Sequence, residues 1–281
     1  MKKVLKVAVL ALFCLVCGVM NAQTDNVIKI LSIGNSFSED AVEQHLYDLA
    51  KADGIKVIIG NMYIGGCSLQ KHLTNANENK PVYKYRKIGL DGVKVETKGF
   101  TLDQALADEQ WDYISFQQQS GRSGMYHTWI ESIPGLLEYT GSRVSKGTKM
   151  MLHQTWAYDQ TSTHKDFKNY GHDQMTMYKA IVDAVKRVSK DTGVKMVIPS
   201  GTAVQNARTT ILNDKITRDG YHLHKTYGRY IAACTWFEKV LKRNVVGNPY
   251  RPANMTEEQQ LAAQKSAHAA VKRPNKITNI K

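Results

Sequence analysis

A serine, an aspartate and a histidine of this chain stand in surroundings that suit nucleophilic catalysis. Ser36 follows the mostly apolar residues 30–33 and lies just before a segment with helical character. Asp219 and His222 are three residues apart, ahead of a second helical segment. In a loop, this spacing lets the carboxylate accept a hydrogen bond from one imidazole nitrogen while the other nitrogen faces outward as a base. The chain thus offers a nucleophile, an orienting acid and a base in the order Ser, Asp, His.

Each of these features also has an ordinary explanation. A serine at the start of a helix commonly caps it, and a single Asp-x-x-His pair is a weak signal. The strand-to-helix turn nevertheless predicts that Ser36 lies at the carboxyl edge of a sheet, where α/β proteins bind ligands. Ser36 is therefore the candidate nucleophile and Ser38 the candidate cap. His224 is a rival base, but the Asp-x-x-His spacing favours His222.

The elements that would hold these residues alternate between strands and helices. Apolar runs at 27–33, 55–59, 111–116, 149–152 and 194–198 predict core strands, and helical periodicity at 39–52 and 173–190 predicts two of the helices. Two alternating stretches between residues 82 and 97 predict a hairpin at the edge of the sheet. No internal repeat or domain-splitting linker interrupts this order, which favours one doubly wound domain.

The first residues have the pattern of a secretory signal. Lys2, Lys3 and Lys6 precede an apolar run at 7–19, and small or polar residues follow it. This run is shorter than the ~18 residues that span a bilayer, so we expect cleavage after Ala22 and no membrane insertion of the mature chain. The predicted divisions are a signal peptide at 1–22, a catalytic domain at 23–246 and a C-terminal extension at 247–281 with a short helix that starts at Thr256. The expected location is periplasmic or extracellular, with a lipid-anchored form as the alternative.

The composition limits the partners. The 281-residue chain has 38 Lys and Arg against 25 Asp and Glu, and without the signal its charge is about +10. A basic exterior suits an acidic polymer such as a uronate-containing polysaccharide, or serves only solubility, because the lysines are spread along the chain. Export and the absence of arginine-rich blocks argue against nucleic acid. The oligomeric state is left open.

The remaining cysteines and histidines give no metal or disulfide pattern. Cys67 and Cys234 could form one disulfide or stay free, since two distant cysteines do not make a scaffold. Four histidines lack the spacing of metal ligands and are interpreted as surface or structural residues: His153, His164, His172 and His224. No metal and no other cofactor is therefore expected.

Four blocks of the sequence carry a resemblance to a known family. They are residues 34–38, the pair Gly65-Gly66 after the second strand, the glutamines at 117–119 that end the third strand, and residues 219–223. Together they resemble the four blocks of the SGNH (GDSL-type) hydrolase superfamily, over about residues 27–241. The chain is most similar to a branch from polysaccharide-degrading bacteria that has Gly-Asn-Ser-Phe-Ser as its first block. The resemblance implies a three-layer α/β/α sandwich around a five-stranded parallel sheet, and ester hydrolysis without a metal.

The resemblance also implies the role of each site residue. Ser36 would attack the ester carbonyl, His222 would transfer the proton and Asp219 would orient the imidazole. The backbone N–H groups of Ser36 and Gly66 would stabilise the oxyanion, together with one side-chain donor. The superfamily usually supplies an Asn as that donor, and alignment of the strand ends puts Gln119 there, with Gln117 as the competitor. Asn35 replaces the usual Asp of the first block, at a position that can support the turn by hydrogen bonds.

Residues on loops after the strands suggest a carbohydrate substrate. Aromatic rings there could stack on a sugar or simply pack, and polar side chains could donate hydrogen bonds to it. The candidates are Trp156, Tyr158, Trp129, Tyr126, Gln205 and Arg208. We therefore expect a secreted carbohydrate esterase that removes acetyl or other small acyl groups from glycans. The alternatives are a lipase, arylesterase or thioesterase, which would need an apolar acyl pocket, and a catalytically silent glycan-binding protein.

Overall fold

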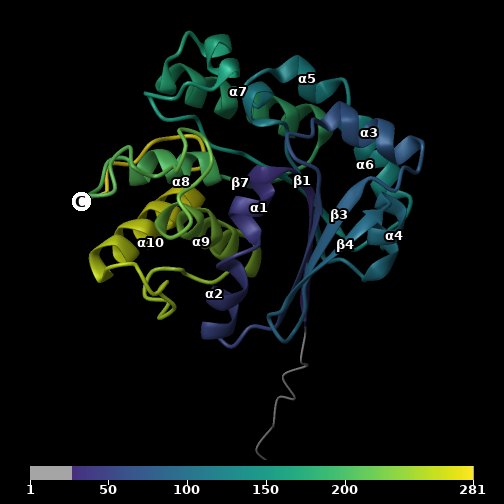
Figure 1. Ribbon diagram of the computed structural model, residues 1–281, viewed down its shortest axis with the longest axis horizontal. Coiled ribbons are helices and arrows are strands. Elements are labelled where there is room, and N and C mark those ends of the chain that lie inside the picture. Colours follow the sequence, from purple (N-terminus) through teal and green to yellow (C-terminus); the bar gives the residue numbers. More distant parts are fainter. Residues whose placement is uncertain (1–26, 281) are drawn as a thin grey trace, which may run out of the picture.

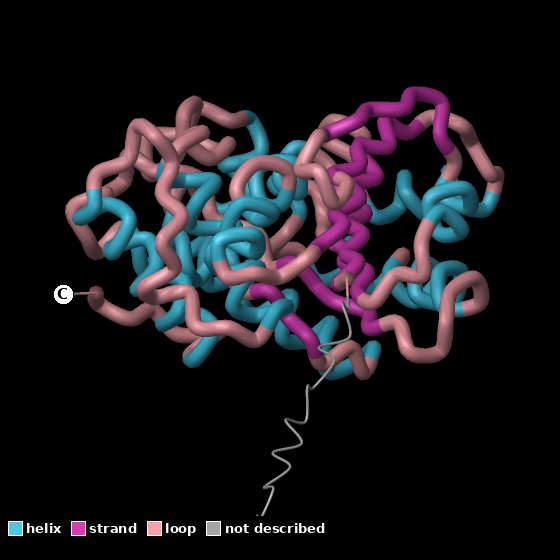
Figure 2. Tube along the Cα trace, turned by 90° about the horizontal axis from the view of Figure 1, so that it is seen from below, coloured by secondary structure: helices cyan, strands magenta, loops and turns pink. Residues whose placement is uncertain are grey.

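A seven-stranded sheet forms the centre of the protein (Figure 1). The computed structural model describes residues 27–280, so the predicted signal peptide lies outside the described residues. The strand order is β4-β3-β2-β1-β5-β6-β7. The strands are β1 (Ile28–Gly34), β2 (Val57–Tyr63), β3 (Tyr83–Ile88), β4 (Lys94–Phe100), β5 (Tyr113–Phe116), β6 (Lys149–His153) and β7 (Met196–Ile198). Figure 2 shows the strands as a band with helices to either side.

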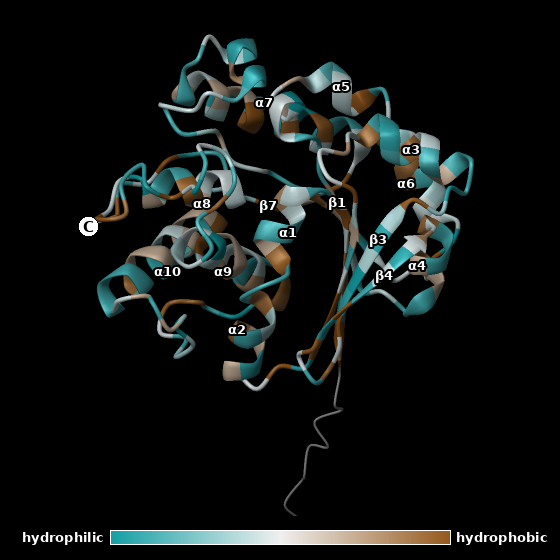
Figure 3. Cartoon of the chain, viewed as in Figure 1, coloured by the Kyte–Doolittle hydropathy of each residue, from teal (hydrophilic) through white to brown (hydrophobic). Residues whose placement is uncertain are grey.

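The expectation of a five-stranded parallel sheet is corrected to seven strands. Strands β2, β1, β5, β6 and β7 are parallel, as predicted, but the hairpin β3–β4 extends the same sheet with antiparallel pairing. This is possible because β2 continues past residue 59 to Tyr63, and its residues Ile59 to Tyr63 pair with β3. The outermost strand β4 is mostly exposed, and Figure 3 shows β3 and β4 as more hydrophilic than the central strands.

The parallel strands are buried because helices cover both faces. Ile30, Leu31 and Ile33 of β1 have no exposed surface, which is typical of near-continuous apolar strands in parallel sheets. Helices α1, α2, α8, α9 and α10 lie on one side of the sheet and α3, α4 and α6 on the other (Figure 1). The helices are α1 (Ser36–Val42), α2 (Leu46–Ala52), α3 (Leu69–Asn77), α4 (Leu102–Asp108), α5 (Tyr126–Ile130), α6 (Ile133–Gly141), α7 (Gln174–Thr192), α8 (Ser200–Ala207), α9 (Tyr227–Leu241) and α10 (Glu257–Lys272). Two 3₁₀ segments, η1 (Ser120–Arg122) and η2 (Lys165–Tyr170), lie in the loops.

The single helix predicted for residues 39–52 is two helices, α1 and α2. Buried polar residues lie at the break, residues 43–45. Glu43 is buried and accepts from Asn61 and Arg86, while both ring nitrogens of His45 contact fixed partners, the Lys225 carbonyl and the Tyr250 hydroxyl. Buried polar side chains with fixed partners therefore occupy the break between the two helices.

The C-terminal helix α10 is longer than the short helix expected, with 16 residues. The predicted start is confirmed, because Thr256 and Gln259 form a capping box. Helix α10 packs against α8 and α9. Among residues 27–280, no helix is both long and apolar enough to cross a membrane.

Candidate active site

Ser36, His222 and Asp219 form a continuous hydrogen-bond chain at the carboxyl edge of the parallel strands. The Ser36 Oγ lies 2.8 Å from His222 Nε2, and His222 Nδ1 lies 2.7 Å from Asp219 Oδ2. Ser36 is partly exposed, so a substrate can reach it. A carboxylate can only accept, so the contact with Asp219 fixes the proton on Nδ1 and leaves Nε2 as the base. The rival His224 instead stacks on Tyr227, with ring centroids 4.1 Å apart.

The turn that presents Ser36 is held by Asn35. Its Oδ1 accepts from the Phe37 N–H at 3.0 Å, so Asn35 is the cap of α1 and the expectation for Ser38 is wrong. The Ser38 hydroxyl is buried and bonds the Asn35 carbonyl and Asn61 instead. Gly34 is required before this turn, because a Cβ there would lie 2.6 Å from the Ser38 Oγ. Ser36 therefore occupies the first position of α1, where backbone N–H groups have no acceptor within the helix.

The loop that carries Asp219 and His222 is a tight hairpin. Thr217 and Leu223 form an antiparallel bridge, and the Arg218 N–H donates to the His222 carbonyl at 2.8 Å. Gly220 has a φ of 88° at the tip, a value that favours glycine. Burial raises the pKa of Asp219, but hydrogen bonds from the His222 side chain and from backbone N–H groups outweigh it and lower that pKa below its ordinary value. Asp219 is thus kept ionised beside His222.

Asp40 joins this loop to the helix of the nucleophile. It lies one turn after Ser36 on α1, is fully buried, and accepts from the Leu223 N–H at 2.7 Å. Its carboxylate also pairs with Arg218 at 3.1 Å and with Arg229 of α9 at 2.6 Å. Burial raises the pKa of Asp40, while the two guanidinium groups oppose this change. The sequence contained no signal for this role, because the partners lie about 180 residues away.

A second support lies behind the loop and corrects the role expected for Arg208. Its guanidinium is almost fully buried and pairs with Asp159 at 2.8 Å. Asp159 in turn accepts from the Thr217 hydroxyl and its N–H donates to the Gly220 carbonyl. Gln205 is also buried and bonds Arg208 and Gln174. In this conformation neither residue can contact a substrate, and both support the Asp219–His222 loop.

The donors expected for the oxyanion hole are only partly available. Gly66 is exposed, has a φ of 62°, and its N–H has no partner within residues 27–280. Gln119 is partly exposed, and its Nε2 lies 3.2 Å from Asp166 Oδ2, which leaves its second N–H unused. Gln117 is buried, and its Nε2 donates to Asn35 Oδ1 at 2.9 Å. The geometry therefore favours Gln119 over Gln117 as the side-chain donor.

His153 is a residue whose importance the sequence did not reveal. Its Nε2 accepts from the Trp236 indole at 3.4 Å, so its Nδ1 carries the proton and donates to Gln117 Oε1 at 2.7 Å. Complete burial lowers the pKa of His153 to about 3, which keeps it neutral. A chain of hydrogen bonds thus runs from β6 through Gln117 to Asn35 and on to the Cys67 carbonyl. It connects the ends of β6, β5 and β1 beneath Ser36.

Three of the four aromatic residues expected to stack on a sugar belong to the core, and the fourth, Tyr126, is partly exposed and donates its hydroxyl to Asp191 at 2.7 Å. Trp156, Tyr158 and Trp129 have no exposed surface, so the expectation of a binding role is wrong for this conformation. Trp156 stacks on Phe37 at 4.4 Å, and its indole N–H donates to the Tyr221 carbonyl. Trp156 therefore holds α1 and the Asp219–His222 loop together. Cys67 and Cys234 are also buried, and both are free, so these two residues form no disulfide.

A family comparison extends over most of this architecture. Residues 29–270 match the profile of DUF4886, a family described as a domain of unknown function. The chain belongs to the DUF4886 family. A crystal structure of a DUF4886 family protein from Bacteroides uniformis is 53% identical, with a TM-score of 0.90, and the match covers 91% of this chain and 98% of that chain. A search of curated proteins found no match.

Solved structures with low identity share the fold of this DUF4886 chain. A candidate SGNH hydrolase from Slackia heliotrinireducens has 22% identity and a TM-score of 0.51, and the match covers 76% of this chain and 99% of that chain. The acetylxylan esterase Axe2 from Geobacillus stearothermophilus has 13% identity and a TM-score of 0.50, with 81% and 97% covered. At these identities the likeness establishes the fold.

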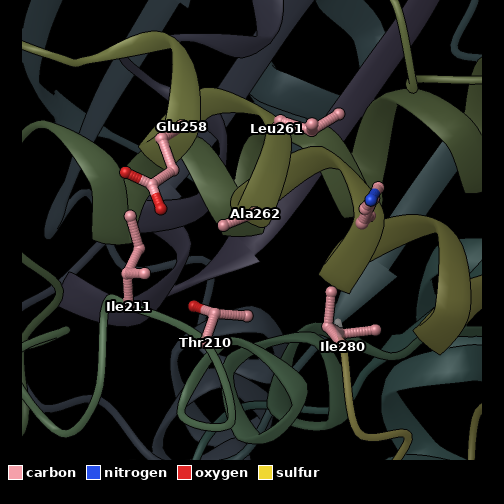
Figure 4. A pocket seen from close by; sticks show the side chains of 7 residues that line it. Thr210, Ile211, Glu258, Leu261, Ala262 and Ile280 are labelled. Carbon is pink, nitrogen blue, oxygen red and sulfur yellow. The ribbon is translucent and has the colours of Figure 1, made fainter.

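A polar cleft of about 430 Å³ is lined by residues of the Gly66 turn, whose neighbour Cys67 accepts a hydrogen bond from Asn35. Gly66 and Gln119 line it, and so does His164, whose ring contacts Tyr221 next to His222. A different hollow, of about 200 Å³, lies between α10, the segment after α8 and Ile280 (Figure 4). No histidine or serine lines that hollow, so it offers no site for the same chemistry. Among residues 27–280, no group of three or more His, Cys, Asp or Glu could hold a metal ion.

Proposed function

We propose that this protein is a serine esterase that removes acetyl or another small acyl group from a glycan. One observation carries the proposal. The partly exposed Ser36 bonds a histidine whose other nitrogen bonds a carboxylate, at 2.8 Å and 2.7 Å. This is the arrangement that activates a hydroxyl as a nucleophile. The shared fold with SGNH hydrolases supports it.

The reaction would proceed in two halves. In the first, Ser36 Oγ attacks the ester carbonyl while its proton passes to His222 Nε2, and His222 then protonates the leaving alkoxide. In the second, His222 takes a proton from water, the resulting hydroxide attacks the acyl-enzyme, and the proton returns to Ser36 as the carboxylic acid leaves. Asp219 keeps the imidazole in the required orientation throughout and stabilises its charged form.

The oxyanion of each tetrahedral intermediate would be stabilised by three donors. They are the backbone N–H groups of Ser36 and Gly66 and the second N–H of the Gln119 amide. Each such donor contributes typically about 2.7 to 4 kcal/mol to transition-state stabilisation. Asp166 holds the Gln119 amide in place and does not use up its donors.

The polar lining of the cleft favours an ester of a small acyl group and a polar alcohol as the substrate, and disfavours a lipid ester. Met125 is the one large apolar side chain among its lining residues in the described chain, so a long acyl chain would find little apolar surface there. A glycan fits a polar cleft, and a glycan substrate agrees with the export that residues 1–22 predict. The named structural relative Axe2 acts on acetylated xylan, which supports acetyl as the first group to test.

The test is hydrolysis of 4-nitrophenyl acetate by wild type and by Ser36→Ala. We expect Ser36→Ala to lose at least about 10³-fold in kcat/KM with an unchanged unfolding midpoint. Ser142→Ala, at an exposed position of α6's C-terminal end, is the matched control and should retain full activity. Activity retained in Ser36→Ala would refute the assignment of the nucleophile. An inactive wild type that still binds glycans would indicate the silent binding protein instead.

A further inference from the structure

The polar cleft lined by Gly66, Gln119 and His164 has positively charged side chains from three separate elements. Lys71 comes from α3, Arg122 from η1 and Lys165 from η2, and all three are exposed lining residues. Asp166 is the one acid among the lining residues. The cleft thus has three cationic side chains against one carboxylate.

These three cations have no partner within residues 27–280. No ion pair and no side-chain hydrogen bond joins Lys71, Arg122 or Lys165 to another described residue. Many other basic side chains close to the site are paired with carboxylates: Arg86, Arg208, Arg218 and Arg229. The Asp166 carboxylate accepts from Gln119, so it is already engaged. The cleft is therefore a concave surface with uncompensated positive charge, which attracts an anion.

The cleft lies on the side of the site where the alcohol part of an ester would bind. His222 must protonate the leaving oxygen, so the alcohol part lies toward His222. His164 lines the cleft, and its ring is 4.6 Å from Tyr221, whose ring is 4.1 Å from that of His222. Gly66, one of the proposed oxyanion donors, also lines the cleft. A sugar whose ester reaches Ser36 would therefore extend into the cleft.

We propose that the substrate is an acylated anionic sugar, whose carboxylate or sulfate is bound by Lys71, Arg122 and Lys165. This inference rests on the proposed esterase function and adds the chemical class of the alcohol. It predicts that a nearby negative charge raises kcat/KM, while a neutral acetylated sugar is a poor substrate. Because the three side chains are exposed, the effect weakens as salt screens it over about 8 Å at physiological ionic strength.

The experiment compares three chemically acetylated polymers: polygalacturonate, dextran sulfate and neutral dextran. Released acetate is measured for wild type, for the double variant Arg122→Gln/Lys165→Gln and for Lys168→Gln. Lys168 is the matched control, because it is an exposed lysine of the same η2 segment that does not line the cleft. We expect the double variant to lose about tenfold in kcat/KM on the anionic polymers and to be unchanged on acetylated dextran. The anionic polymer that responds shows whether carboxylate or sulfate is bound.

Three results would overturn the inference. They are equal wild-type rates on neutral and anionic polymers, an equal loss of the double variant on both, or an equal loss in Lys168→Gln. Two further measurements separate this failure from failure of the proposed function. Hydrolysis of 4-nitrophenyl acetate by wild type tests the esterase alone. Calorimetric binding of unacetylated polygalacturonate, dextran sulfate and dextran to Ser36→Ala tests anion recognition without turnover, and binding limited to the anionic polymers supports it.

Discussion

Gln117 and Gln119 are separated by one residue, yet their side chains have different surroundings. Gln117 points into the interior and connects His153 to Asn35, whereas Gln119 lies at the cleft with one N–H unused. The alternation of side chains along a strand would place both on one face. The strand ends at Phe116, however, and the chain turns into η1 at Ser120, so that rule no longer applies to these residues.

The two glutamines should therefore respond differently to substitution. Gln119→Ala should lower kcat on 4-nitrophenyl acetate by about 10²- to 10³-fold, because one oxyanion donor is lost. Gln117→Ala should lower the free energy of unfolding by about 1 to 3 kcal/mol, because it leaves the buried His153 Nδ1–H without an acceptor and removes one of the two donors to Asn35 Oδ1. The measurements are steady-state kinetics and urea unfolding of both variants. A larger kcat loss in Gln117→Ala at unchanged stability would transfer the donor role to Gln117.

At the residue scale, the sequence identified the three residues of the candidate triad but not the residues that hold them in place. Ser36, Asp219 and His222 were predicted from turn position, spacing and family resemblance, and the structure brings them together. Their catalytic roles stay predictions. Trp156 and Arg208 were expected at the substrate, because an aromatic or arginine side chain on a loop looks the same in the sequence whether it is exposed or buried. The burial depends on contacts with residues distant in the sequence, such as Tyr221 for Trp156 and Asp159 for Arg208.

Helix α1 and the Asp219–His222 loop are joined mainly through Asp40. Because Ser36 belongs to the helix and His222 to the loop, this contact controls the distance between nucleophile and base. We expect Asp40→Asn to lower the free energy of unfolding by about 3 kcal/mol, since two arginines then lose a buried anionic partner. We also expect a lower kcat in the protein that remains folded, because small misplacements of catalytic groups are costly.

The control for this prediction is Asp53→Asn. Asp53 lies at the exposed end of α2 and makes one surface ion pair, with Arg243 at 3.6 Å. Its loss should change stability by less than about 1 kcal/mol and leave kcat unchanged. Urea unfolding and turnover of 4-nitrophenyl acetate are measured for both variants. Wild-type kcat in Asp40→Asn would show that the contact does not position the pair.

Elements with strong local patterns were predicted well, and those fixed by distant contacts were not. The five core strands, the β3–β4 hairpin and the start of α10 after Thr256 follow from local sequence and are present. The break between α1 and α2 depends on Asn61, Arg86 and Tyr250, which no local window contains. The extension of the sheet to seven strands likewise depends on where β2 ends against β3.

For the whole molecule, two buried histidines should make stability depend on pH. Burial lowers the pKa of His153 to about 3 and that of His72 to about 4, from 6.5. The folded protein therefore keeps both neutral at pH values where the unfolded chain would protonate them. The contribution of these two histidines to the free energy of unfolding is therefore fully present above about pH 6.5 and is lost as the pH falls toward 4. Each histidine contributes a slope of up to about 1.4 kcal/mol per pH unit.

His72→Phe isolates one of the two contributions without disturbing the hydrogen bonds beneath Ser36. His72 is fully buried, stacks on Tyr83 with ring centroids 5.6 Å apart, and its Nδ1 bonds the Tyr83 hydroxyl at 3.0 Å. His72→Phe therefore lowers stability at every pH by the loss of that hydrogen bond, and only the change with pH reports the titration of His72. We expect the fall in unfolding free energy between pH 6.5 and pH 4.5 to be about 1 to 2.5 kcal/mol smaller in His72→Phe than in wild type. His127→Phe, at an exposed position of α5, should follow the wild-type dependence. Urea unfolding at pH 7.0, 6.0, 5.0 and 4.5 makes the comparison, and identical slopes for His72→Phe and wild type would mean that His72 does not titrate as its burial requires.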